Sequence, residues 1–104
     1  MTVFARLEVT PVGTEKLSPE IAKAVAALEQ FDVSYETTPM ATVLAGDSVD
    51  EVFAAVQAAH KAVSTDRVLT AVEIDDCHGQ TESLADRVES IETELGRPPT
   101  NASP

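Results

Sequence analysis

The spacing of the apolar residues is the feature that most constrains the fold of this chain. Over residues 2–10, apolar side chains such as Val3 and Leu7 alternate with residues that are polar except for Phe4. This period of two predicts a strand with one buried face. The alternation ends at Pro11 and Gly13, which are typical of a turn. The chain therefore opens with a predicted strand of a sheet.

The next segment changes to the spacing of a helix. Ser18 and Pro19 form a typical helix start, with Ser18 as the N-cap and Pro19 as the first helical residue. Ile21, Val25 and Leu28 then recur at intervals of three and four residues. We therefore expect an amphipathic helix of about 13 residues.

The two patterns recur along the rest of the chain. Two short strands are predicted over residues 33–38 and 40–45, and a longer one over residues 67–75. Between them, Ser48 and Glu51 predict a capping box at the start of a second helix. The apolar face of that helix would carry Val52, Phe53, Val56, Ala59 and Val63. A third helix is predicted from the stripe of Leu84, Val88, Ile91 and Leu95, ending at Gly96.

The order β-α-β-β-α-β predicts an α+β fold, a ferredoxin-like sandwich with a four-stranded antiparallel sheet, plus a C-terminal helix. Right-handed crossovers place the first two helices on one face of the sheet. We expect a single domain over residues 1–96 and a disordered tail over residues 97–104. The other face would expose Phe4, Leu69 and Ala71. Such a face favours a homodimer or homotetramer, or coverage by the third helix.

The acidic excess of the chain limits its partners. The sequence holds 18 acidic against 7 basic residues, a net charge of −11. Nucleic acid and anionic membranes are therefore unfavourable partners, and no stretch is apolar enough to span a bilayer. The single cysteine, Cys77, excludes an internal disulfide. We expect a cytoplasmic protein from a halophilic source, because molar salt shortens the Debye length to about 3 Å and screens the repulsion.

No sequence motif of catalysis is present, and two weaker candidates involve histidine. The run from Asp75 through Asp76 and Cys77 to His78 could hold a divalent ion. However, strand alternation sends Asp75 and Asp76 to opposite faces, which favours a solvated loop and no metal site. His60 is expected at the boundary of the second helix rather than in a site. We therefore expect neither an enzyme nor a metal or cofactor centre.

Polar residues near the strand ends form a third candidate. These residues are Thr10, Tyr35, Met40, Thr42 and Thr70. Threonine hydroxyls facing a helix layer need partners when they are buried. Either the hydroxyls bond one another or backbone carbonyls, or a small heteroaromatic ligand lies among them. The residue pattern alone leaves both alternatives open.

Several segments of the chain resemble the YkoF-related thiamine-binding protein family. The resemblance extends from about Val3 to Leu95, and its most specific part is the run from Tyr35-Glu36 through Pro39-Met40 and Thr42 to Gly46. The other matching segments are residues 7–14, 50–62, 67–70 and 74–76. The resemblance implies a ferredoxin-like fold and assembly into dimers or tetramers through the sheet face. It also implies binding of thiamine or its hydroxymethylpyrimidine portion, without an established enzymatic activity.

Strand geometry and the resemblance together suggest roles for the candidate residues. Tyr35 or Met40 would pack on a ring of the ligand, and Thr42 and Thr70 would hydrogen-bond its pyrimidine. An acid such as Asp75 would balance the charge of a small cationic heterocycle. The alternative is an oligomeric structural or regulatory protein with no small-molecule ligand.

Overall fold

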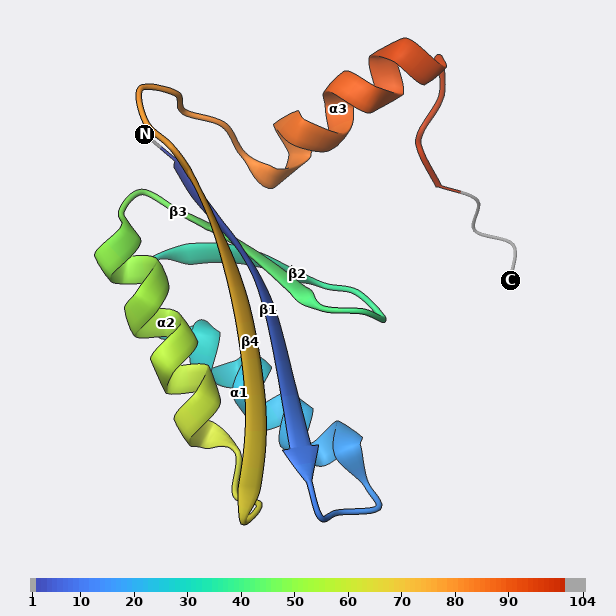
Figure 1. Ribbon diagram of the computed structural model, residues 1–104. Helices are drawn as coiled ribbons and strands as arrows, with labels where there is room; N and C mark the ends of the chain where they lie inside the picture. Colours follow the sequence, from blue (N-terminus) through green and yellow to red (C-terminus); the bar gives the residue numbers. More distant parts are fainter. Residues whose placement is uncertain (1, 101–104) are drawn as a thin grey trace.

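The sheet of the computed structural model, which describes residues 2–100, has four strands in the order β2-β3-β1-β4, and each neighbouring pair is antiparallel. Helices α1 and α2 lie side by side on one face of it (Figure 1). The elements in chain order are β1 (Thr2–Val12), α1 (Leu17–Leu28), β2 (Val33–Thr37), β3 (Thr42–Gly46), α2 (Val49–Ala62), β4 (Arg67–Cys77) and α3 (Leu84–Leu95). The predicted ferredoxin-like sandwich is confirmed.

Residues 97–100, which follow α3, form neither a helix nor a strand. They are exposed, and the remainder of the predicted tail, residues 101–104, lies outside the described residues. Within residues 2–100, no helix is both long and apolar enough to cross a membrane.

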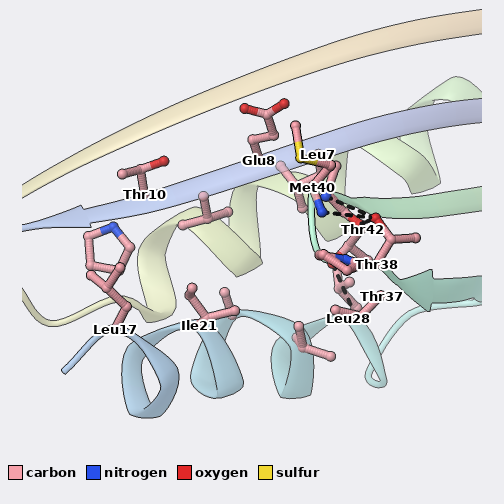
Figure 2. A pocket seen from close by; sticks show the side chains of 16 residues that line it. Leu7, Glu8, Thr10, Leu17, Ile21, Leu28, Thr37, Thr38, Met40 and Thr42 are labelled. Carbon is pink, nitrogen blue, oxygen red and sulfur yellow. Dashed lines mark hydrogen bonds between the residues drawn. The ribbon is translucent and has the colours of Figure 1, made fainter. Parts of the chain in front are cut away.

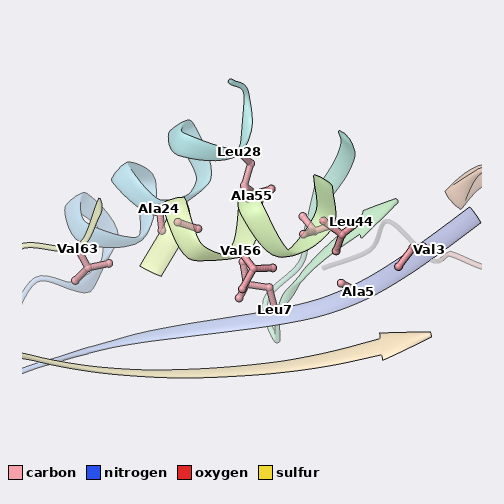
Figure 3. Packing of buried hydrophobic residues seen from close by; sticks show 11 residues of the cluster. Val3, Ala5, Leu7, Ala24, Leu28, Leu44, Ala55, Val56 and Val63 are labelled. Carbon is pink, nitrogen blue, oxygen red and sulfur yellow. The ribbon is translucent and has the colours of Figure 1, made fainter. Parts of the chain in front are cut away.

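The core lies between the sheet and the two helices, as Figure 3 shows. The pairing of β1 with β3 sets Ala5 opposite Leu44 and Leu7 opposite Thr42, so the alternation predicted for β1 faces the helices. Leu28 of α1 and Val52 of α2 are almost fully buried against this layer. Small buried residues let the two helices approach each other and the sheet closely. They are Ala24, Ala55 and Ala59.

Two predicted helix starts need correction. Helix α1 begins at Leu17, with Lys16 and not Ser18 in the N-cap position and no side-chain cap. Leu17 lies four residues before Ile21, so the earlier start adds one more apolar side chain to the same face. At α2, Ser48 accepts the Glu51 N–H as predicted, but Glu51 does not reach back. Its Oε1 instead accepts the N–H of Asp32 at 2.9 Å and ties the helix start to the loop after α1.

The predicted position of Phe53 was also wrong. This ring is 49% exposed, whereas Val52 and Val56 are buried. Successive helix residues are separated by about 100°, so the residue that follows Val52 turns away from the sheet.

The second face of the sheet is only partly covered. Phe4 on this face is buried, and the Arg87 guanidinium lies 4.3 Å from its ring centroid. Leu69 on the same face remains 50% exposed. Helix α3 extends away from the sheet (Figure 1) and has no buried residue. The predicted cover by the third helix therefore reaches Phe4 and not Leu69.

The start of α3 carries a complete capping box that the sequence reading missed. The Ser83 hydroxyl accepts the Asp86 N–H at 3.0 Å, and the Asp86 carboxylate accepts the Ser83 N–H at 2.9 Å. The helix ends at Gly96, whose φ of 79° is the left-handed conformation of a helix C-cap. The spacing of Ser83 and Asp86 was a usable signal, because an acid three residues after serine is typical of this motif.

Glu20 joins the start of α1 to the segment after α2. Its carboxylate accepts the Ser64 N–H at 2.7 Å and the Lys23 ammonium at 2.7 Å. The hydrogen bond from Lys23, followed by the one from Ser64, lowers the pKa of Glu20. These bonds favour the ionised form of the side chain in the folded protein.

A Glu20→Gln variant should therefore lose part of the acid sensitivity of the native protein. Because the folded-state pKa is lowered, the stabilisation by Glu20 is complete above the unfolded-state pKa of about 4.3 and is lost as the pH falls below it. Urea unfolding at pH values on both sides of this range would measure the change. Glu94→Gln removes the same charge from α3 and should keep the native pH dependence. Identical pH profiles for the two variants would contradict the prediction.

Candidate functional site

A cleft of about 230 Å³ lies between α1, the second half of β1 and the β2–β3 hairpin (Figure 2). Ile21 points from α1 into it, and Thr42 contributes from β3. Most of the lining is apolar. The lining residues are Leu7, Glu8, Val9, Thr10, Pro11, Leu17, Ile21, Ala24, Val25, Leu28, Thr37, Thr38, Pro39, Met40, Ala41 and Thr42.

Local hydrogen bonds shape the hairpin side of the cleft. The Thr38 hydroxyl accepts the N–H groups of Met40 and Ala41 at 3.2 and 3.1 Å, and it donates to the Ala41 carbonyl at 2.8 Å. Threonine side chains commonly close turns in this way. The turn therefore has an ordered shape before any ligand arrives, with Pro39 and Met40 at the edge of the cleft.

The polar part of the cleft is a pair of threonine hydroxyls. The Oγ1 atoms of Thr37 and Thr42 are 3.2 Å apart, and Thr42 is only 8% exposed. One proton lies between the two oxygens, so the pair keeps a second proton and free lone pairs. The buried Thr42 thus has a hydroxyl partner, as the first alternative expects, but this partner is the exposed Thr37, and the pair can still donate to and accept from a further molecule.

Three of the six predicted site residues belong to this cleft. Thr42 lines it as expected. Met40 also lines it, although this residue lies in the turn before β3 and not within a strand, and is 81% exposed. Thr10 contributes only from its backbone side, because its side chain lies on the opposite side of β1 from α1 (Figure 2).

The other three predicted residues lie elsewhere. Tyr35 donates its hydroxyl hydrogen to Glu29 at 2.7 Å, and this hydrogen bond to a carboxylate raises the pKa of Tyr35. Thr70 does face the helices, but its hydroxyl is bonded to His60 Nδ1. Strand β1 lies between β3 and β4, so Thr70 and Thr42 are not brought into one site.

Asp75, the third of these residues, lies on the second face of the sheet, whereas the cleft lies on the helix-covered face. Its carboxylate accepts the Arg87 guanidinium at 3.2 Å on the second face of the sheet. Asp76 lies opposite Val3 and so faces the helices, where it pairs with His78 at 3.4 Å. Burial and the hydrogen bond to Asp75 raise the pKa of the Cys77 thiol. Within residues 2–100, no group of three or more potential metal ligands is assembled.

The sequence reading missed the helical wall of the cleft. Leu17, Ile21 and Val25 belong to the stripe that also supplies the buried Leu28. Residues at this spacing share one helix face whether they pack on a sheet or line a cavity. The apolar pattern therefore cannot distinguish residues that line a cleft from residues that pack in the core.

Comparisons with known proteins agree with this architecture. A family model described as "Thiamine-binding protein" matches residues 5–92. The UPF0045 protein of Methanothermobacter thermautotrophicus is 41% identical over 98 residues, covering 89% of this chain and 99% of that protein. A hypothetical protein of Methanocaldococcus jannaschii has a crystal structure that superposes with a TM-score of 0.79 at 30% identity, over 86% of this chain and 95% of its own.

A second solved structure supports the fold at greater distance. It is described as a candidate thiamine biosynthesis or salvage protein of Thermotoga maritima, and it superposes with a TM-score of 0.75 at 19% identity. The match covers 88% of this chain and 99% of the Thermotoga protein. Because the family model spans most of the sequence and agrees with the resemblance noted from its segments, the chain belongs to the thiamine-binding protein family.

Proposed function

We propose that this protein binds thiamine or its hydroxymethylpyrimidine portion in the cleft beside α1, as a binding protein and not as an enzyme. The observation that carries the proposal is the Thr37–Thr42 hydroxyl pair in a cleft lined mostly by apolar residues. Small-molecule sites commonly combine apolar walls with a few convergent polar groups. An aminopyrimidine matches this pattern, because its ring faces are apolar and its edge both donates and accepts hydrogen bonds.

The size of the cleft favours one ring over the whole vitamin. Its volume of about 230 Å³ is below the range of about 300–1,000 Å³ that holds drug-sized ligands. The pyrimidine would therefore lie inside, with Met40 against its face, and the cationic thiazolium would remain outside. The net charge of −11 favours a cation at the surface.

The family assignment supports the same ligand class. The matching family model is described as "Thiamine-binding protein". The similar Thermotoga structure is described as that of a candidate thiamine biosynthesis or salvage protein. The lining also argues for binding over catalysis. Glu8 is its one ionisable residue among those described, and the Glu8 side chain lies on the far side of β1 (Figure 2).

Removing the Thr42 hydroxyl should weaken ligand binding. Thr42→Val keeps the shape of the side chain but loses one hydrogen bond to the ligand. Such a bond contributes about 0.5–1.5 kcal/mol, so the dissociation constant for hydroxymethylpyrimidine should rise by about twofold to tenfold. Isothermal titration calorimetry in molar KCl, with thiamine and hydroxymethylpyrimidine as ligands, would measure this change.

Thr70→Val is the matched control for this experiment. It makes the same substitution on the helix-facing side of β4, away from the cleft, where Thr70 bonds His60. Its binding constants should equal those of the native protein. The proposal fails if neither ligand binds at millimolar concentration, or if Thr70→Val weakens binding as much as Thr42→Val does.

A second candidate function is assembly into a homo-oligomer without a small ligand. Exposed apolar side chains in two separate places favour it, one on the second sheet face and a stripe along one face of α3, because an apolar helix face without a partner commonly marks an interaction site. They are Leu69, Val88, Ile91 and Leu95, each between 45% and 56% exposed.

Sedimentation equilibrium in molar KCl should detect a dimer or tetramer. Leu69→Glu should shift the population to monomer, because it sets a charge among apolar contacts. Gln57→Glu adds the same charge on the outer side of α2 and should leave the assembly intact. A monomeric native protein would contradict this candidate, and assembly without ligand binding would favour it over the first.

A further inference from the structure

We infer that Met40 is a site of reversible oxidation by peroxides, and that its oxidation weakens ligand binding in the cleft. The inference rests on the proposed function and concerns the regulation of the same site. It follows from the exposure of the Met40 thioether, from the turn that holds this residue at the edge of the cleft, and from the chemistry of sulfur beside an aromatic ring.

The Met40 side chain is open to small oxidants in solution. It is 81% exposed, whereas the other exposed large apolar side chains within residues 2–100 range from 40% to 56%. A peroxide therefore reaches the sulfur without any opening of the fold. Oxidation of methionine to its sulfoxide is a common modification of proteins, and reductases reverse it.

The turn keeps this exposed residue at the cleft. The Met40 N–H donates to the Thr38 hydroxyl at 3.2 Å, and the Thr38 N–H donates to the Ala41 carbonyl at 2.9 Å. These bonds fix the backbone on both sides of Met40, so its side chain stays among the lining residues (Figure 2). A change in the polarity of Met40 therefore acts at the edge of the cleft, where the ring of the proposed ligand would lie.

The oxidation is a two-electron step with hydrogen peroxide as the oxidant. The Met40 sulfur attacks one peroxide oxygen, an S–O bond forms as the O–O bond breaks, and the second oxygen leaves as water with both protons. In the reverse step a dithiol supplies two electrons and two protons and becomes a disulfide, while the sulfoxide oxygen leaves as water. The thioether is thereby restored.

The sulfoxide should be a poorer neighbour of an aromatic ring than the thioether. A thioether packs favourably on such a ring, whereas a sulfoxide is polar and holds water that the ring would displace. The Thr38 hydroxyl of the same turn cannot replace that water, because it already donates to the Ala41 carbonyl at 2.8 Å. A sulfoxide that accepted from the Thr37–Thr42 pair would occupy the donor that the ligand needs. In both cases the oxidation of Met40 opposes binding.

Calorimetry before and after peroxide treatment would measure this loss. The native protein would be titrated with hydroxymethylpyrimidine in molar KCl, and mass spectrometry would locate the added oxygen. Once Met40 carries the oxygen, the dissociation constant should rise by about twofold to tenfold, the range expected for the loss of one contact between sulfur and an aromatic ring. Reductases for both sulfoxide epimers, supplied with a dithiol, should restore the original value.

Two variants separate Met40 from the other oxidisable groups. Met40→Leu keeps Met1 and Cys77, the other sulfur-containing residues of the sequence. Met40→Leu combined with Gln57→Met also keeps an exposed thioether, now on the outer side of α2. Each variant is compared with its own untreated form, and peroxide should leave both dissociation constants unchanged.

A bound ligand should in turn protect Met40. A ring that packs against this side chain covers part of its surface, so saturating hydroxymethylpyrimidine should slow the oxidation of Met40 in the native protein by at least about twofold. In the combined variant, the ligand should leave the oxidation rate of the thioether at position 57 unchanged.

These results are distinguishable. An unchanged dissociation constant after complete oxidation of Met40, resistance of Met40 to peroxide, or equal oxidation rates with and without ligand would overturn the inference and leave the proposed function standing. An equal loss of affinity in Met40→Leu would assign the effect to another residue and would also overturn the inference. Absence of binding to the untreated native protein would remove the proposed function and the inference with it.

Discussion

Replacing Leu44 with alanine should lower the free energy of unfolding by about 2–5 kcal/mol. Leu44 is fully buried in the middle of β3, where it lies between Ala5 of β1 and Tyr35 of β2. The substitution removes apolar surface and leaves a cavity that the surrounding strands cannot close. A loss of this size is a large part of the total stability of a small domain.

Urea unfolding in molar KCl would measure the loss, with Leu69→Ala as the control. Leu69 is the same residue type but is 50% exposed on the second face of the sheet, so its truncation in the monomer should change the free energy of unfolding by less than about 1 kcal/mol. Equal losses for the two variants would contradict the packing described for β3.

A methyl group at position 46 should also destabilise the protein. A Cβ atom on Gly46 would lie 2.9 Å from Val52 Cγ2 and 3.2 Å from Val33 Cγ1. Val52 is fully buried and has little room to move. Overpacking of this kind costs about 1–3 kcal/mol, and the lower chain entropy of alanine returns about 0.5–1 kcal/mol. The difference between the two effects lies between about 0 and 2.5 kcal/mol, and we therefore expect Gly46→Ala to lower the free energy of unfolding by about 1 kcal/mol.

A double-mutant cycle would identify the cause of this loss. In a Val52→Ala background the nearest atom is absent, so Gly46→Ala should cost less than it does in the native protein. The same cost in both backgrounds would show that contact with Val52 is not responsible. Thermal and urea unfolding of the four proteins would provide the values.

The fold was predictable because its main signals are local. Alternation over β1 and β4 and the helical spacing from Ile21 to Leu28 each reflect one element, and chain order with right-handed crossovers then leaves few topologies. The predicted ends of the helices and strands were less accurate, because those ends depend on tertiary contacts. Asp76 and Cys77 proved to lie within β4, beyond the predicted strand end at residue 75, since pairing with β1 extends that strand to Cys77.

The candidate site was only partly predictable for a related reason. The alternation of residues correctly predicts that Thr42 and Thr70 lie on the same face of the sheet. The distance between them depends on the strand order, because β1 lies between β3 and β4. The position of Met40 directly after Pro39 predicts the start of a strand, whereas the Thr38 hydroxyl closes a turn that includes Met40. The helical wall of the cleft has the same pattern as a core stripe.

The attachment of α3 has a consequence for how the molecule opens. The contacts that join it to the sheet converge on the Arg87 side chain, which meets Phe4, Asp75 and Cys77. Its own apolar residues bury little surface, so few interactions must break when the helix melts. In an isolated chain α3 is therefore a separate unit of local unfolding, whose amide hydrogens would exchange with solvent long before those of the sheet.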